Sequence, residues 1–389
     1  MLFTPKFIPV GTCVCPTCGR RFTDAVYREA TSRTGAKLSK GIRGYHLEPW
    51  APDGKPDPLE VNFDPKQVPK NEVPDYITVT TADQHQHQWY RVCPLCPNNV
   101  RIPHGVGNLP TYLIPVIGIR NQGKSCLLYQ LACAGSIRSV NRSIDGFSLW
   151  PADIHTKIDR VPKEHNATAQ TTSFVLREKS ENGDPGKEVA VIIFQDLEGE
   201  LFENDTAKEK NGIKGKPDIK ARAVIRDALI QNSSALIFVS TPVANDGNLY
   251  KDHISDYLSH NQGPIAFVLA KFDMIADGCF GEKYTTTKDN NGNVVTLLSP
   301  NTFPVDNGHG AYYAINTLRK RFALEKYIAE KDPFVGIFSA TDDLNRNMRS
   351  VFLVKSCSEI DKDYLDYRNP VNAYDPILWI LQKLGLLAL

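Results

Sequence analysis

The sequence has little that would place it in a membrane or among broadly basic proteins. No run approaches the roughly 18 consecutive apolar residues that a membrane helix requires, and Pro5, Lys6 and Pro9 interrupt the start of the chain, unlike a secretory signal. The 45 lysines and arginines are balanced by 44 aspartates and glutamates, which argues against nucleic-acid binding over most of the surface. These absences predict a cytoplasmic globular protein.

The cysteines do not form a pattern typical of a disulfide framework. There are nine, an odd number for a chain of 389 residues, and five lie in two groups near the N-terminus. Two Cys-Pro-x-Cys pairs, Cys15 with Cys18 and Cys93 with Cys96, have the spacing at which thiolates converge on one tetrahedral ion. Four thiolates predict a closed structural Zn²⁺ site. Three further side chains remain as alternative ligands: Cys13 in place of Cys15, and His85 or His87.

The character of the sequence changes after about residue 108. The first 108 residues are rich in proline and polar residues and contain only short strand candidates. From Thr111 on, apolar runs typical of buried strands alternate with helical or irregular segments, at 112–118, 189–195, 234–240, 264–270 and 334–338. This alternation predicts an α/β domain over 111–389, with a mostly parallel sheet and helices on both faces. The two cysteine pairs resemble those of zinc ribbons, so a small zinc-ribbon-like domain is expected over 1–108, with a long insertion between the pairs.

Three local patterns predict further elements of the second domain. The stretch 171–178 is expected to pair with 189–195 as an antiparallel edge strand across a turn-rich connection. KYTTTKDNNGNVVTLLS (283–299) carries an Asn-Gly turn between β-rich arms, which is typical of a hairpin insertion. Asp375-Pro376 is a helix start and Gly385 a helix stop, which predicts a closing helix.

The first apolar run leads into a glycine-rich stretch, GIRNQGKS at 118–125, which matches G-x-x-x-x-G-K-[ST]. In this pattern the glycines let backbone amides surround a phosphate chain, and the following helix points its positive end at it. Lys124 reaches the β and γ phosphates, and the Ser125 hydroxyl ligates Mg²⁺. The residues expected to bind phosphate are Gly118, Asn121, Gln122, Gly123, Lys124, Ser125 and Cys126.

Three later stretches, each at the end of a predicted strand, extend this pattern to a whole nucleotide. In Asp196-Leu197-Glu198-Gly199, Asp196 is placed for the magnesium shell and Gly199 for a γ-phosphate contact. In Ala270-Lys271-Phe272-Asp273, the Asp273 carboxylate can accept two hydrogen bonds from guanine, whereas adenine presents an acceptor there. The backbone of Ser339-Ala340 is expected to contact the guanine oxygen.

In this order, the four stretches resemble the P-loop GTPases of the translation-factor-related class, which includes the Ras-like and Era-like proteins. The resemblance covers about 111–389. It implies the P-loop GTPase fold, hydrolysis of GTP to GDP and phosphate, and guanine specificity through Asp273 with Lys271 packing over the ring. A GTPase joined to zinc modules also has a faint likeness in layout to predicted GTPases of bacterial conflict systems, including the double-GTPase families.

Three departures from the family pattern bear on turnover. Ala270 stands where the family has Asn or Thr, which weakens the tie between the base loop and the phosphate loop. Glu200 replaces the catalytic glutamine, and a carboxylate cannot donate to the transferred phosphoryl group, so slow or partner-activated hydrolysis is expected. The candidates for the switch threonine that closes on magnesium are Thr168, Thr171 and Thr172, of which the last two are nearest the strand start.

Asn121 has two interpretations. In Era-like relatives an asparagine at this position helps to hold K⁺, which supplies charge to the reaction, so the resemblance implies that K⁺ activates this chain as well. Asparagine is also common in loops because it tolerates turn geometry, which is the simpler interpretation.

The stretch from Arg20 to Arg43 is locally basic, with seven basic residues against Asp24 and Glu29. A cluster beside a zinc knuckle can touch nucleic acid. The following stretch, 48–83, has eight acidic and three basic residues, so the two can neutralise each other. We favour neutralisation over nucleic-acid binding, because aromatic side chains on which bases stack are few in the basic stretch.

The expected function is that of a Mg²⁺-dependent GTPase, a molecular switch coupled to a zinc module and to protein partners through the segments 160–172 and 200–217. One alternative is a nucleotide-bound interaction scaffold with little turnover, which Glu200 and Ala270 favour. Another alternative is a GTP-regulated nucleic-acid-binding protein, which requires that the basic cluster from Arg20 to Arg43 contacts nucleic acid.

Overall fold

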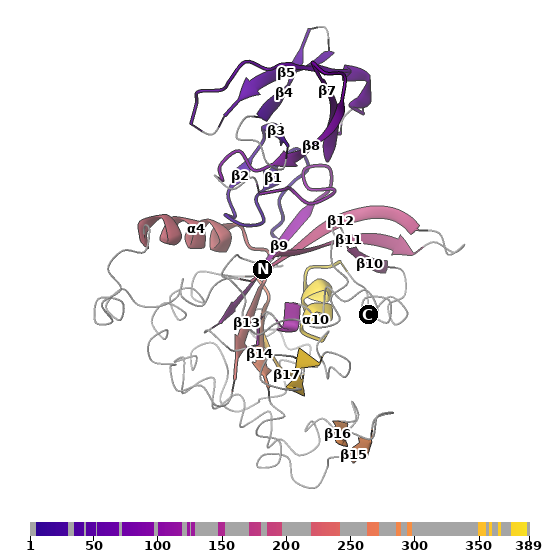
Figure 1. Ribbon diagram of the computed structural model, residues 1–389. Coiled ribbons are helices and arrows are strands. Elements are labelled where there is room, and N and C mark those ends of the chain that lie inside the picture. The colour runs from indigo at the N-terminus through magenta and orange to yellow at the C-terminus, as the bar shows by residue number, and fades with distance from the viewer. Residues whose placement is uncertain are drawn as a thin grey trace.

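The computed structural model describes nineteen segments of the chain: 5–29, 35–42, 44–51, 53–69, 72–96, 100–118, 123–124, 126–128, 147–151, 171–179, 185–196, 219–241, 263–271, 285–288, 294–297, 349–354, 358–359, 365–366 and 375–386. Within these segments, no helix has both the length and the apolar character to cross a bilayer. The segments form two large sheets, one above the other in Figure 1.

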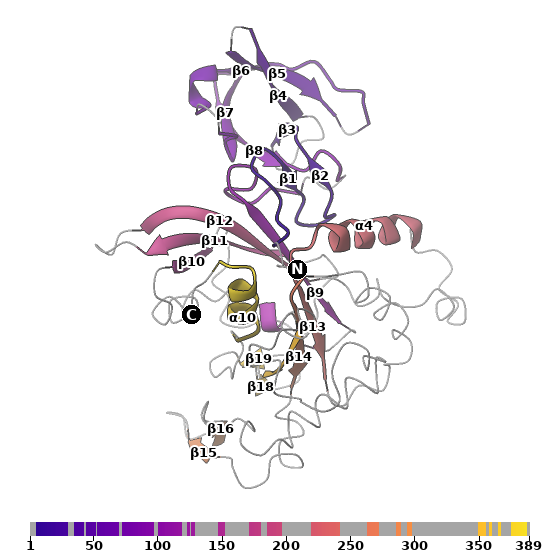
Figure 2. The same cartoon turned by 180° about the vertical axis from the view of Figure 1, so that it is seen from behind.

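The N-terminal sheet has six antiparallel strands in the order β5-β4-β3-β8-β7-β6. Its strands are β3 (Ala25–Arg28), β4 (Gly35–Gly41), β5 (Gly44–Trp50), β6 (Val61–Phe63), β7 (Tyr76–Thr81) and β8 (Gln86–Val92). The sheet curls around a small core, as Figures 1 and 2 show, in which Tyr27, Ile77 and Trp89 are buried. A 3₁₀ turn, η1 (Pro65–Gln67), precedes β7, and a short hairpin of β1 (Cys13–Val14) and β2 (Arg21–Phe22) precedes the sheet.

This region contains far more strand than the sequence predicts. The stretch between the two cysteine pairs, expected as an irregular insertion, forms the six-stranded sheet. Its strands are short, and in β5 exposed residues alternate with half-buried ones, so that no apolar run stands out. A sheet that faces solvent on one side needs only every second residue to be apolar.

The second sheet has seven strands in the order β10-β11-β12-β9-β13-β14-β17. Their bounds are β9 (Thr111–Gly118), β10 (Phe147–Pro151), β11 (Thr171–Lys179), β12 (Pro185–Asp196), β13 (Leu236–Ser240), β14 (Ile265–Ala270) and β17 (Arg349–Val354). The five strands from β12 to β17 are parallel, whereas β10 and β11 are antiparallel additions. The sheet is therefore mixed, with a parallel centre.

Four of the predicted strands are confirmed as β9, β12, β13 and β14, and 171–178 is confirmed as the antiparallel partner of β12. The prediction that this partner forms the edge is wrong, because β10 pairs with β11 on its outer side. The predicted strand 334–338 lies outside the described residues. On the side away from β13, β14 pairs with β17, with Ala270 opposite Val354.

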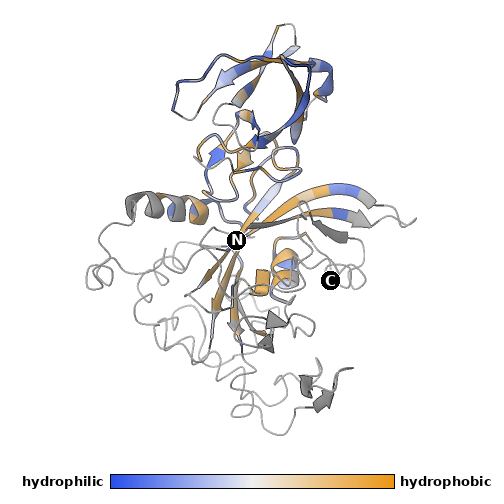
Figure 3. Ribbon diagram, in the orientation of Figure 1, coloured by the Kyte–Doolittle hydropathy of each residue, from blue (hydrophilic) through white to orange (hydrophobic). Residues whose placement is uncertain are grey.

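The closing helix is confirmed as α10 (Asp375–Lys383), which packs on one face of the sheet. Its buried face includes Ile377, Ile380, Leu381 and Leu384, and each such aliphatic side chain contributes about 2 kcal/mol by leaving water. The helix ends at Lys383, Leu384 continues its buried face, and Gly385 leads the chain away, with the Leu386 amide donating to the Leu381 carbonyl at 2.9 Å. Figure 3 shows this helix and the central strands as the most apolar part of the molecule. The described helices do not establish the predicted cover on both faces.

Smaller elements lie around the second sheet. The helix α4 (Ile219–Asn232) leads into β13 and lies between the two sheets in Figure 1. The predicted hairpin within 283–299 is confirmed by the antiparallel pair β15 (Thr285–Lys288) and β16 (Val294–Leu297). A last short pair is β18 (Ser358–Glu359) with β19 (Leu365–Asp366), visible in Figure 2.

Candidate functional site

The glycine-rich loop follows the end of β9 at the carboxyl edge of the parallel strands. Gly118 lies against β13 so closely that a Cβ atom on it would be 2.1 Å from the Val239 carbonyl oxygen. Any side chain there would force β9 and β13 apart. The chain then turns through Gly123, and the described residues 124 and 126–128 are helical. The strand before the glycine-rich loop and helical residues after it, both of which the phosphate-binding pattern requires, are therefore present.

Lys124 lies inside this turn and is only 7% exposed. Its Nζ donates to the Gly118 carbonyl oxygen at 3.0 Å. Burial lowers the pKa of Lys124, and the negative charge of Asp196 acts in the opposite direction. Asp196 is the last residue of β12, the strand next to β9, so the two predicted phosphate and magnesium residues lie at the same edge and sense each other's charge.

The end of β14 approaches the same loop from another side. A Cβ atom added to Gly123 would lie 3.4 Å from the Cβ of Ala270, so the end of β14 lies close to the loop and leaves room for little more than a glycine there. Lys271 follows with a φ of 54°, a left-handed conformation that turns the exposed lysine out of the strand direction. The atom of β14 nearest to the Gly123 position is the methyl carbon of Ala270.

The remaining predicted nucleotide residues are distributed as follows. Thr171 and Thr172 begin β11, where Thr171 is opposite Gln195, the neighbour of Asp196. Cys126 is half-buried in the helical turn after the loop. Nine residues lie outside the described part of the chain: Asn121, Gln122, Ser125, Thr168, Gly199, Glu200, Asp273, Ser339 and Ala340.

The four cysteines of the two pairs converge into one cluster. Their Sγ atoms all lie within 4.8 Å of one another, with 3.6 Å between Cys15 and Cys96 and 4.0 Å between Cys18 and Cys93. All four are buried. Such a closed, thiolate-only set is compatible with a structural zinc ion and has no place for a substrate.

Backbone and side-chain donors surround the sulfur atoms. The amides of Thr17 and Cys18 donate to the Cys15 sulfur at 3.4 and 3.3 Å, and the Leu95 amide donates to that of Cys93 at 3.4 Å. The Arg20 guanidinium donates to the Cys18 sulfur at 3.5 Å. Donors of this kind stabilise the thiolate forms that bind metal.

The alternative ligands lie elsewhere. Cys13 is buried near the Val106 carbonyl and the Arg91 guanidinium, at 3.9 and 4.0 Å. His85 pairs with Asp83 at 3.8 Å, and His87 pairs with Glu29 at 3.2 Å. The structure therefore brings together the set Cys15, Cys18, Cys93 and Cys96 and excludes these three side chains from it.

The cysteine cluster rests directly on α4. Gly19, which follows Cys18, has a φ of 66°, and a Cβ atom on it would be 2.4 Å from a methyl carbon of Leu229. The Asn232 side-chain amide donates to the Gly19 carbonyl at 2.8 Å. Lys6 also donates to the Gln231 carbonyl, so the end of α4 contacts the N-terminal domain through three residues.

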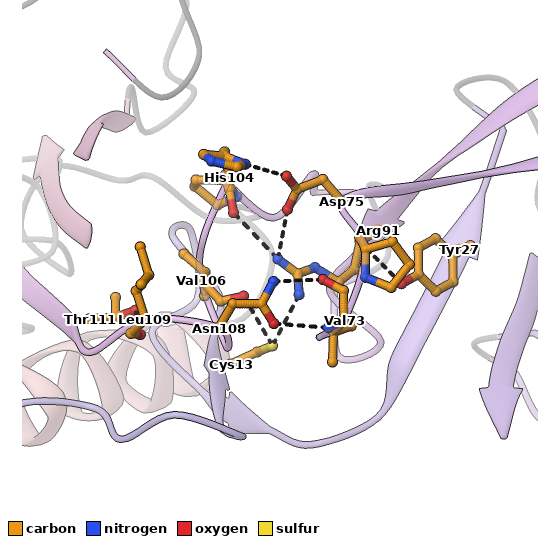
Figure 4. Close-up of polar contacts among 12 residues, drawn as sticks. Cys13, Tyr27, Val73, Asp75, Arg91, His104, Val106, Asn108, Leu109 and Thr111 are labelled. Atoms are coloured by element: carbon orange, nitrogen blue, oxygen red, sulfur yellow. Dashed lines mark hydrogen bonds and ion pairs between the residues drawn. The ribbon is translucent and has the colours of Figure 1, made fainter. Parts of the chain in front are cut away.

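A second contact between the two domains is polar, and Figure 4 shows its N-terminal part, in which His104 and Arg91 contact Asp75. His104 joins Asp75, just before β7, to Glu188 on β12, with Nε2 at 3.1 Å from the Glu188 carboxylate. The buried Arg91 donates to Asp75 at 3.2 Å. Hydrogen bonding to Asp75, against the opposing effect of burial, raises the pKa of His104 to about 9. At neutral pH the imidazolium therefore links two carboxylates, one from each sheet.

No family model matches this sequence, and no curated protein does either. Among solved structures, it is similar to the ADP-ribosylation-factor-like GTP-binding protein, small COPII coat GTPase SAR1, from Encephalitozoon cuniculi in complex with GDP. The identity is 12%, covering 71% of this chain and 79% of that chain, with a TM-score of 0.30. It is also similar to the G domain of the FeoB iron transporter of T. maritima, at 13% identity over 43% of this chain and 76% of that chain, with a TM-score of 0.22. Similarities this low add nothing to the geometry described above.

Several residues of the site have no clear signal in the sequence. Gly19 could have been noticed as the glycine that closes a Cys-Pro-x-Cys turn, but its partners Leu229 and Asn232 are more than 200 positions away. His104 and Glu188 belong to no motif that the sequence analysis recognised. Their roles arise only where the two sheets meet.

Proposed function

We propose that this chain is a Mg²⁺-dependent GTPase that acts as a nucleotide switch coupled to its metal-binding N-terminal domain. The observation that carries the proposal is the convergence of Lys124, Asp196 and the end of β14 around the loop that starts at Gly118. These groups come from three parallel strands that end at one edge, which is where open α/β sheets bind their ligands.

The roles follow from the chemistry of each group. A phosphate oxygen is a charged acceptor and would compete with the neutral Gly118 carbonyl for the Lys124 ammonium. Asp196 and Ser125, with Thr171 or Thr172, would hold Mg²⁺ between the phosphates. Asp273 would bind the guanine N–H donors, and Lys271, turned outward after β14, would cover the ring. Glu200 would orient water without donating to the phosphoryl group, which makes unassisted turnover slow.

Side-by-side titration of zinc-replete protein with GTP and ATP in Mg²⁺ tests this assignment. We expect GTP to bind at least about tenfold more tightly, roughly 1.4 kcal/mol, because adenine presents an acceptor to Asp273. Equal affinity for ATP would contradict the recognition of guanine by Asp273, and the chain would then be a P-loop NTPase of another class. Binding of neither nucleotide would contradict the proposal as a whole.

Single-turnover hydrolysis then separates a switch from a scaffold. Slow release of phosphate from bound GTP supports the switch, whereas bound GTP that stays intact supports a nucleotide-bound scaffold, the alternative that Ala270 and Glu200 favour. The same assay in K⁺ and in Na⁺ tests whether Asn121 holds an activating cation, because equal rates in the two salts would remove that role.

The coupling is proposed to run through α4. This helix is the first described element after Asp196, and its last turn is held by Gly19 of the cysteine cluster. An ordered cluster would fix the end of α4 and thereby restrict the segment 197–218, which connects the helix to the nucleotide edge. Loss of the metal would release that restriction.

Gly19→Ala is expected to change the dissociation rate of bound GDP severalfold while the protein keeps its zinc. The new Cβ would overlap Leu229 at 2.4 Å, so the cluster and α4 must separate. Stopped-flow release of a fluorescent GDP analogue measures the effect. Gly11→Ala is the matched control, since Gly11 has a φ of 86° with nothing within 4 Å of the added atom. Equal rates in the two variants would show that α4 does not transmit the state of the cluster.

A further inference from the structure

The outer face of the N-terminal sheet carries a row of aromatic and guanidinium groups that crosses five strands. The row runs through directly paired positions: Trp50 on β5 is opposite Gly35 on β4, Gly35 is opposite Arg28 on β3, Arg28 is opposite Tyr90 on β8, and Tyr90 is opposite Tyr76 on β7. Paired positions on neighbouring strands point to the same face. The intervening positions Tyr27, Ile77 and Trp89 lie in the core, so the row faces away from it.

The side chains of the row contact one another. The Arg28 guanidinium lies 5.4 Å from the centre of the Trp50 ring, and it crosses β4 in the space that Gly35 leaves open. Tyr76 and Tyr90 have ring centres 6.2 Å apart. The exposed Arg101 lies over Tyr90, with 3.9 Å between its guanidinium carbon and the ring centre. Aromatic planes and fixed cations therefore alternate across the sheet.

The accessible part of the row is at β7 and β8. Tyr76 is 48% exposed, and Tyr90 and Trp50 are partly exposed, whereas Arg28 is buried beneath its neighbours. Along the two strands the same face continues with Thr78, Gln88 and Gln86, which offer neutral donors and acceptors. Neither β7 (YITVTT) nor β8 (QHQWYRV) contains an acidic residue. Five strands span about 19 Å, a length suited to a polymer rather than to one small molecule.

We propose that this face binds single-stranded nucleic acid, with bases stacked on Tyr76, Tyr90 and Trp50 and a phosphate near Arg101. Stacking surfaces beside a guanidinium suit unpaired bases, which expose their faces, better than a duplex, which hides them. The linear cluster from Arg20 to Arg43 is not the basis of this inference. Arg20 donates to the Cys18 sulfur and Lys37 pairs with Asp24 at 2.8 Å, so these two cations already have protein partners.

The inference does not depend on the chemistry of the phosphate loop, and its test uses the full chain without added nucleotide. Fluorescence anisotropy with labelled 12-mers of mixed sequence, as single-stranded RNA, single-stranded DNA and duplex DNA, measures binding at two salt concentrations. We expect single strands to bind more tightly than the duplex. Tyr76→Ala and Tyr90→Ala should each weaken binding about tenfold, since loss of one stacking surface has effects of this order.

Matched variants separate stacking from a general loss of charge or of fold. Tyr76→Phe keeps the ring and should bind as the unaltered protein does, while Arg101→Ala should reduce the salt dependence. Arg21→Ala removes an exposed arginine outside the row and should leave affinity unchanged. Absence of single-strand binding would overturn the proposal. So would affinity that survives both Tyr→Ala changes, or affinity that falls equally in Arg21→Ala, because either result places the contact elsewhere.

Discussion

Replacement of Lys124 by alanine is expected to weaken GTP binding at least about a hundredfold, roughly 2.7 kcal/mol, with little change in thermal stability. A buried ammonium that bonds a phosphate makes a charge-assisted contact in a place from which water is largely excluded. In the protein without nucleotide, the Lys124 ammonium donates to the neutral Gly118 carbonyl, a weaker acceptor than a phosphate oxygen, so we expect nucleotide affinity to fall by more than the free energy of unfolding. Isothermal titration with GTP measures the change.

The control for this variant is Lys187→Ala, which removes an exposed lysine on β12, away from the loop. It should leave GTP affinity unaltered, which excludes a general effect of net charge. If Lys124→Ala binds GTP as tightly as the unaltered chain, the loop at 118–125 is a structural turn and the GTPase proposal fails.

Cys18→Ser is expected to reduce bound zinc from one ion per chain to nearly none and to lower the melting temperature by more than about 10 °C. Binding of structural zinc in small domains supplies about 10–16 kcal/mol of apparent free energy, so loss of one of four ligands removes a large part of the stability of the N-terminal domain. Elemental analysis and differential scanning fluorimetry measure the two effects. Chelation of the unaltered protein should give the same shift.

Cys13→Ser is the matched control, because Cys13 is as buried as the ligands but belongs to a different contact set with Val106 and Arg91. It should retain one zinc per chain. Retention of zinc by Cys18→Ser, or loss of zinc by Cys13→Ser, would show that the ligand set assigned from the four-cysteine cluster is wrong.

The parts of the fold that were predicted correctly share one property. The strands β9, β12, β13 and β14 are continuous apolar runs because both of their faces are buried, and such runs are visible without any knowledge of their neighbours. The helix α10 was equally visible, because a cap, a first-turn proline and a closing glycine frame its apolar face. The N-terminal sheet was not predicted, because half-exposed strands carry a weak pattern. The position of β10 at the edge of the sheet was not predicted. Which strand forms an edge is decided only when all the strands have paired, and the local sequence does not show this.

Contiguous residues by themselves specified two patterns: the glycine-rich stretch 118–125, which matches the phosphate-binding pattern, and two thiol pairs with metal-binding spacing. Backbone amides, an ammonium and thiolates act over a few ångströms, so a short stretch is enough to specify them. Only the tertiary structure decided which of these groups meet. Strand register placed Asp196 near Lys124 and aligned Trp50, Arg28, Tyr90 and Tyr76 across one face, and packing brought Gly19 onto α4. Such contacts join residues that are tens to hundreds of positions apart, and they depend on the pairing and packing of whole elements.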